Sequence, residues 1–184
     1  MRRYVIPVIA LALALCNPVL ASVGKNSGEV GLGFGITEFD SNTFNEAGIG
    51  YGVRGGYNFN KLFEVEGQLS QTTASDNDPV LGDLELTATS MFVNGVFNFH
   101  PRPAIVPYAL VGFGNTSVEY KDPTGSVDDS STALQVGGGS RFFFGEEKKV
   151  ALRVEVALIN ESTFDQDSTH TNIVGGLTWN LGKN

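Results

Sequence analysis

The sequence contains few residues of the types that carry catalysis. Histidine is the side chain best suited to acid–base chemistry near neutral pH, and the chain has only two, His100 and His170. His100 precedes the turn-forming Pro101-Arg102-Pro103, where we expect a surface position. His170 follows Ser168-Thr169, where we expect an exposed residue at the rim of the fold. Neither belongs to a Ser/His/Asp set whose spacing supports nucleophilic catalysis, so no catalytic residue is predicted.

Ligand-binding motifs are equally sparse. Gly31-Leu32-Gly33-Phe34-Gly35 and Gly137-Gly138-Gly139 are rich in glycine, but no helical pattern follows them, as a phosphate-binding loop requires. Asp76-Asn77-Asp78 matches part of a calcium loop without its later Gly and Glu positions. A net charge of −8 argues against non-specific binding to nucleic acid, which needs Lys and Arg to neutralise phosphates. We therefore expect no cofactor, no metal site and no nucleic-acid partner.

Six charged residues form a more informative pattern. Three arginines and three glutamates lie on the polar side of segments in which apolar and polar residues alternate: Arg54, Glu64, Glu66, Arg141, Arg153 and Glu155. Their charges balance, and the planar guanidinium of Arg can bind a carboxylate at two points. Buried charges are tolerated when they are paired and hydrogen-bonded. These residues predict a paired network inside the fold; the alternative is six unrelated charges on a solvated face.

The segments that carry these charges alternate with a period of two, which is typical of β-strands. In the first segment, for example, Leu32 and Phe34 alternate with Gly31, Gly33 and Gly35. We predict eight such segments, near residues 29–39, 48–59, 63–70, 90–99, 106–119, 134–144, 150–158 and 172–181. The register of the fourth and fifth segments stays open, because several large residues compete for the apolar face: Phe92 and Val96 in the fourth, and Tyr108, Leu110, Val111 and Phe113 in the fifth.

The connections between the segments alternate between short and long. Short connections are predicted near residues 58–62, 100–107 and 145–149, and long ones near 40–47, 72–84, 121–131 and 160–168. The long connections are rich in acids, including Asp76, Asp78, Asp128 and Asp129. Together these features predict an all-β fold, an eight-stranded antiparallel up-and-down transmembrane β-barrel with tight periplasmic turns and long external loops.

A soluble barrel would show the same period with its apolar face turned inward. The polar face, however, carries mainly Gly, Asn, Thr and Gln, with no Lys in the strand cores. Aromatic residues also gather near the short connections, as in the belts of membrane proteins. The predicted aromatic girdle consists of Phe59, Phe63, Phe99, Tyr108, Phe144 and Trp179. We therefore expect the apolar side chains to face lipid and the charge network to lie in the lumen.

The N-terminal residues 1–21 have the features of a cleaved secretory signal peptide. Arg2 and Arg3 precede an apolar stretch, and Ala21 offers a small residue for cleavage before Ser22. The apolar stretch is shorter than the roughly 20 residues that a spanning helix needs. Cys16, the only cysteine, would be lost with the signal. The mature chain, residues 22–184, is predicted to form one outer-membrane β-barrel domain.

A resemblance to a known family rests on four stretches: residues 107–114 (PYALVGFG), 134–144 (LQVGGGSRFFF), 152–158 (LRVEVAL) and 174–181 (VGGLTWNL). Their order and spacing are similar to those of the small outer-membrane β-barrel family, which includes the OmpA transmembrane domain and OmpX-like proteins. The resemblance implies the Gram-negative outer membrane as location, outer-membrane lipid and lipopolysaccharide as surroundings, and the barrel-assembly machinery and periplasmic chaperones as partners. Gly176, Trp179 and Leu181 resemble the C-terminal assembly signal of such barrels.

Eight strands leave an interior just wide enough to be filled by side chains. We therefore expect a monomeric structural barrel, not an enzyme, with a largely closed lumen and acidic external loops that contact lipopolysaccharide, cations or host surfaces. One alternative is a narrow pore for small solutes, which requires the network to open. Another is a lipid-modifying enzyme, because some small barrels are lipid A deacylases with a His-x-Ser-Asn motif. Here Asn172 stands where that motif has serine.

Overall fold

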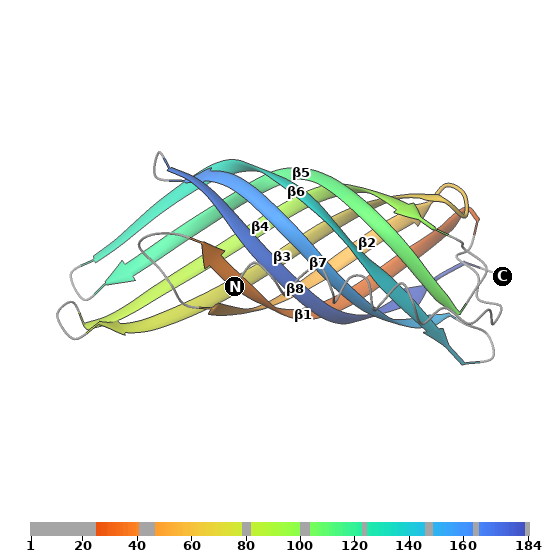
Figure 1. Cartoon of the computed structure of the whole chain (residues 1–184), viewed down its shortest axis with the longest axis horizontal. Helices are drawn as coiled ribbons and strands as arrows, with labels where there is room; N and C mark the ends of the chain where they lie inside the picture. Colours follow the sequence, from red (N-terminus) through yellow and green to blue (C-terminus); the bar gives the residue numbers. More distant parts are fainter. Residues whose placement is uncertain are drawn as a thin grey trace.

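The computed structural model describes residues 25–40, 47–78, 82–99, 104–122, 125–145, 149–163 and 166–182. These residues form eight strands: β1 (Ser27–Asp40), β2 (Ala47–Asn58), β3 (Phe63–Asp78), β4 (Gly82–Asn98), β5 (Ile105–Asp122), β6 (Gly125–Phe144), β7 (Val150–Thr163) and β8 (Gln166–Asn180). Each strand pairs antiparallel with the next, and β1 pairs with β8, so that the sheet closes into a barrel (Figure 1). The predicted fold is confirmed. The predicted signal peptide, Cys16 and His100 lie outside the described residues.

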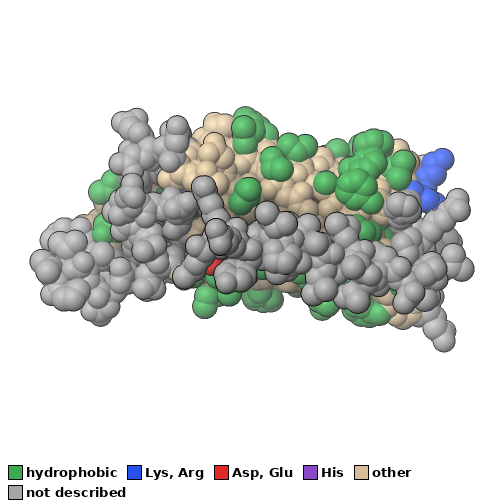
Figure 2. Space-filling view, viewed as in Figure 1, with side chains coloured by type: hydrophobic (Ala, Val, Ile, Leu, Met, Phe, Trp, Pro, Cys, Tyr) green, Lys and Arg blue, Asp and Glu red, His purple; other side chains and the backbone are tan. Residues whose placement is uncertain are grey.

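The alternation of side chains gives the barrel wall two different faces. The outward residues are large and apolar, and Phe34 and Ile49 are 71% and 74% exposed. The inward residues include fully buried charges such as Glu66 and Arg141. This is the arrangement of a barrel in lipid, because a soluble barrel would place its apolar side chains in the middle. Figure 2 shows hydrophobic side chains standing out over the visible part of the described wall. No described segment forms a helix long and apolar enough to cross a membrane.

The structure settles the two registers that the sequence left open. Strand β4 turns Phe92 and Val96 into the lumen, where both are buried. The Phe92 ring lies against Gly114, its partner in the β4–β5 ladder, where a Cβ atom would overlap it. Strand β5 turns Tyr108 and Leu110 inward, where they pack with Val96. Large side chains on the lumen face therefore fill space that glycines on neighbouring strands leave open, while Val111 and Phe113 point outward.

The predicted long loops are wrong in extent, because much of their length is strand. Strand β5 ends at Asp122 and β6 begins at Gly125, with the two residues paired. The β6–β7 ladder, in contrast, stops at Ala133 opposite Glu161. Strands β3 to β6 therefore project as paired hairpins beyond the closed wall (Figure 1). Apolar alternation ends where the lipid ends, whereas backbone pairing continues through polar residues, so the strands are longer than the alternating segments.

Candidate functional site

The six predicted lumen charges all lie on the inward face of the wall. The period of two places Glu64 and Glu66 on one side of β3, and Arg153 and Glu155 on one side of β7. Strands β2 and β6 contribute the other two arginines. No member of the set is more than 9% exposed: Arg54, Glu64, Glu66, Arg141, Arg153 and Glu155. The fold thus brings together residues that are far apart in the sequence.

Arg153 is the centre of the network. It binds Glu66 on β3 through both terminal nitrogens, and its Nη2 donates to Glu155 Oε2 at 2.6 Å. Arg54 Nη1 approaches the same two carboxylates, at 3.2 Å from Glu155 Oε2 and 3.5 Å from Glu66 Oε1. Asn94 adds a hydrogen bond to Glu66 Oε1 at 3.4 Å. These bonds connect β2, β3, β4 and β7 across the lumen, and charge-assisted bonds of this kind are the strong ones in proteins.

Arg141 forms a second centre nearer the short turns. Its Nη2 donates to Glu64 Oε2 at 2.6 Å, and its Nη1 donates to Asn98 Oδ1 at 3.2 Å. Its Nε lies 3.4 Å from Glu29 Oε1. Glu29 also belongs to the lumen, although it is not among the six predicted network residues. The signal was present, because Glu29 has the same parity as the inward residues Gly31 and Gly33 on β1.

The interpretation of Tyr108 as a girdle residue is wrong. Tyr108 is only 3% exposed and lies inside the barrel, where its hydroxyl donates to Glu155 Oε2 at 2.7 Å. The hydroxyl also accepts a hydrogen bond from Arg153 Nε at 2.7 Å. Its ring packs against two guanidinium groups, with centroid distances of 5.1 Å to Arg141 and 4.6 Å to Arg153. Tyr108 therefore joins the two centres of the network, through hydrogen bonds and cation–π contacts.

The other predicted girdle residues point away from the lumen. Four are exposed on the outer wall, near the end that carries the short turns: Phe59, Phe63, Phe99 and Phe144. Trp179 is partly exposed on β8. Phe97 links two of the four, with ring centroids 5.1 Å from Phe63 and 5.0 Å from Phe99. Of the residues assigned to the assembly signal, Leu181 is exposed beyond β8, whereas Gly176 lies tightly against Leu32 in the wall.

The external half of the lumen is built differently, from hydroxyls and glycines. Pairs of hydroxyls connect strands: Ser90 on β4 with Thr116 on the adjacent β5 at 3.1 Å, and Thr37 on β1 with Thr72 on β3, past the intervening β2, at 3.3 Å. Small cavities lie between them, lined in part by Gly33, Gly35, Gly50 and Gly52. The expectation that His170 is exposed is wrong, because it is buried at 7% and its Nε2 lies 2.8 Å from Glu161 Oε1. Inward parity on β7 and β8 accounts for the position of both residues.

The comparison with known families rests on nearly the whole sequence. The family described as outer membrane protein beta-barrel domain matches residues 8–180. The chain belongs to this family. No curated protein sequence matches it significantly. As a member of the family, the protein is an outer-membrane barrel of a Gram-negative bacterium, with its apolar outer face in lipid.

Solved structures of other outer-membrane barrels have the same fold. Ail, the attachment invasion locus protein of Yersinia pestis, has a TM-score of 0.62 at 18% identity, over 85% of this chain and 99% of Ail. Neisserial surface protein A has a TM-score of 0.71 at 11% identity, over 83% and 96%. The N-terminal β-barrel domain of Pseudomonas aeruginosa OprF has a TM-score of 0.55 at 14% identity, over 85% and 100%. At these identities the likeness shows the fold, while function depends on each protein's own residues.

Proposed function

We propose that the protein is a structural barrel of the outer membrane whose lumen is held closed by paired charges. The observation that carries this proposal is the Arg153 centre, which bonds Glu66 on β3 and Glu155 on β7 from opposite parts of the wall. An eight-stranded barrel has little interior space beyond what its side chains fill. Here Tyr108, Phe92 and the arginines occupy that space, so the network takes the place of a hydrophobic core.

The proposal predicts negligible conductance. Purified, refolded protein inserted into planar lipid bilayers should show no sustained channel current in 1 M KCl, because the bridged charges block the axis. The matched control is Lys121→Ala, which removes an external ion pair and should likewise give no channel current. Sustained large conductance from the wild-type protein would overturn the closed lumen and favour a narrow pore.

We further propose that the external end contacts cationic groups, including divalent cations that bridge lipopolysaccharide. Glu85 and Asp128 are exposed on the projecting hairpins, and Lys121 is paired with Glu119 at 3.2 Å. Ail has been solved in complex with the heparin analogue sucrose octasulfate, which is a polyanion. An acidic end repels polyanions, so a heparin-like partner is not supported for this chain. Host surfaces with basic groups fit better.

An enzymatic role is not proposed. The deacylase alternative needs a histidine that reaches lipid, whereas His170 points into the lumen and pairs there with Glu161. Lipid A from cells that express the protein should therefore have the same mass spectrum as lipid A from cells that express His170→Ala. Loss of an acyl chain with the wild type alone would establish the enzyme.

The remaining proposals concern export and assembly. Residues 1–21 would direct the chain to the periplasm and be removed there, and periplasmic chaperones would deliver it to the barrel-assembly machinery. Trp179 and Leu181, both on the lipid side of the wall at the end of β8, support a C-terminal recognition signal together with Gly176. A monomer is proposed, because closure of β1 on β8 leaves no free edge in the closed part of the wall.

A further inference from the structure

The periplasmic half of the lumen has one more acid than base among the described residues. Glu29, Glu64, Glu66 and Glu155 are buried there with only three arginines, Arg54, Arg141 and Arg153. Glu29 is the extra carboxylate, since it has no arginine to itself and Arg141 already bonds Glu64. An uncompensated buried charge is strongly unfavourable. The network is therefore expected to recruit one more positive charge.

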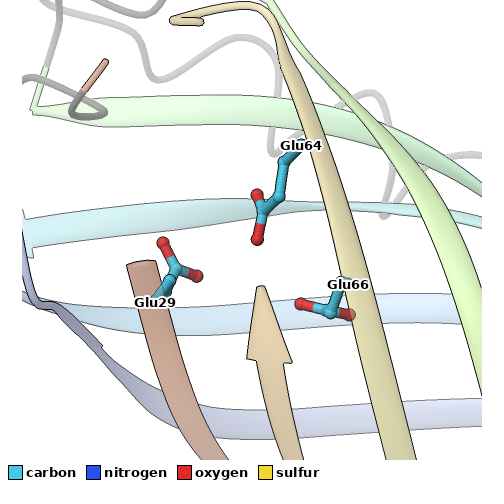
Figure 3. Close-up of side chains that lie close together, drawn as sticks. All are labelled: Glu29, Glu64 and Glu66. Carbon is cyan, nitrogen blue, oxygen red and sulfur yellow. The ribbon is translucent and has the colours of Figure 1, made fainter. Parts of the chain in front are cut away.

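Three carboxylates face one another at this place. Oxygens of Glu29, Glu64 and Glu66 all lie within 4.8 Å of each other, and the side chains converge from β1 and β3 (Figure 3). Two oxygens bound to the same Ca²⁺, at about 2.3–2.6 Å each, are at most about 5 Å apart. The spacing of the three carboxylates is thus compatible with a shared cation.

The atoms that lack a donor identify where a cation would bind. Glu66 is fully engaged by Arg153 and Asn94. In contrast, Glu29 Oε1 and Glu64 Oε1 are buried and accept no hydrogen bond from any described residue. Arg141 does not remedy this, because its Nε lies near Glu29 Oε1 without the geometry of a hydrogen bond.

An uncharged residue gives independent support. Asn58 is completely buried and stands directly opposite Glu64 in the β2–β3 ladder, on the same lumen face. Its amide nitrogen donates to Ser27 O at 3.5 Å, while its Oδ1 accepts nothing from the part of the chain that the structure describes. A buried amide oxygen without a donor is rarely left so in a folded protein. Because Asn58 is paired with Glu64 on the same face, its unpaired oxygen adds a third candidate ligand atom to those of Glu29 and Glu64.

A glycine on the intervening strand lets the Glu64 carboxylate reach this position. Gly56 on β2 stands between Glu29 on β1 and Glu66 on β3 in the two ladders. A Cβ atom on Gly56 would overlap Glu64 Oε1, so the missing side chain creates the space into which that carboxylate projects. Ser27 begins β1 and Asn58 ends β2, which places the space close to the periplasmic end of the barrel.

We propose that Glu29, Glu64 and Asn58 bind one hard cation, of the Ca²⁺ or Na⁺ type, at the periplasmic end of the lumen. All three supply oxygen, the donor type that such ions prefer. The ion neutralises the extra carboxylate and joins β1, β2 and β3 below the Arg153 centre. The sequence predicted no metal site, because these residues meet only through the registers of β1 on β2 and of β2 on β3, and because Glu29 was not included in the predicted network.

The test measures the thermal unfolding midpoint of refolded protein in detergent, followed by heat-modifiable gel migration. CaCl₂ and NaCl are each titrated against choline chloride at equal ionic strength. For the wild type, at least one of the two metal ions should raise the midpoint by about 3 °C or more and then saturate, as expected for a ligand that binds only the folded state. A midpoint that depends on neither ion overturns the proposal. A midpoint that responds only to pH in choline chloride also overturns it, and would indicate that the extra carboxylate binds a proton.

Two variants separate this site from the acidic exterior. Glu29→Gln removes the extra charge and should abolish the cation response, with a midpoint in choline chloride at or above that of the wild type. Gly56→Ala keeps every charge but displaces the Glu64 carboxylate from its position, and it should also abolish the response. Glu119→Gln, an exposed acid, is the control and should respond as the wild type does. An equal response in the wild type and in either lumen variant would place the bound ions outside the lumen and contradict the proposal.

Discussion

The two halves of the lumen are filled by different kinds of side chain. The periplasmic half is filled by large charged side chains whose bonds cross between distant strands, as Arg153 does between β3 and β7. The external half is filled by small hydroxyl side chains that bond to near neighbours, such as Ser90 and Thr116, and it retains small cavities. A bond to a charged group contributes about 1.5–3 kcal/mol, and a neutral one about 0.5–1.5 kcal/mol. The periplasmic half should therefore hold the barrel together, and the external half should be the more adaptable one.

The largest expected effect is that of Arg153→Ala. It leaves Glu66 and Glu155 buried without their main partner and should lower the unfolding free energy by about 3–5 kcal/mol. Urea unfolding in detergent micelles, monitored by gel migration, gives the value. Val154→Ala, at the adjacent lipid-facing position, is the control. A loss below about 1 kcal/mol for Arg153→Ala would remove the energetic difference between the two halves.

A smaller effect is expected in the external half for His170→Ala. The substitution deprives the buried Glu161 of a bond at 2.8 Å, which should reduce the unfolding free energy by about 1–3 kcal/mol in the same assay. Glu161→Gln, which keeps an acceptor for the ring, should lose less. If His170→Ala is as damaging as Arg153→Ala, the external half is not the weaker one.

The smallest effect is expected outside the lumen, for Lys121→Ala. Its partner Glu119 lies 3.2 Å away, but both side chains are roughly half exposed. Exposed ion pairs contribute little, so the unfolding free energy should change by less than about 0.5 kcal/mol. A change comparable with that of His170→Ala would show that the projecting hairpins, rather than the lumen, limit stability.

The period of two was sufficient to predict the fold and the inward direction of the charges. Alternation in β7 assigns Arg153 and Glu155 to one face. The corresponding face of β1 and β2 is rich in glycine, which indicates an interior with little space for side chains. The same rule also applied to Glu29 and His170, whose parity is inward. His170 was predicted to be exposed and Glu29 was left out of the network, because both stand near strand ends, where sequence alone does not show how far the wall continues.

Other features of the site depend on contacts between strands that sequence does not reveal. Tyr108 competes with Val111 for the apolar face, and only the pairing of β5 with its neighbours decides between them. In the lumen, the Tyr108 hydroxyl donates a hydrogen bond to Glu155 and accepts one from Arg153, and no local sequence pattern predicts these bonds. The space at Gly56 likewise depends on the simultaneous register of β1 and β3 on β2.

The continuation of β3 to β6 past the closed wall changes what a neighbouring cell or an antibody would meet. Only two residues separate Asp122 from Gly125, and ladder bonds hold the hairpin arms up to that point. The surface presented there is therefore a hydrogen-bonded extension of the sheet, which is stiffer than a set of long loops would be. A partner that binds this extension orders few residues of the protein, so little conformational entropy is lost. The extension does not adapt its shape, however, so the partner must already be complementary to it.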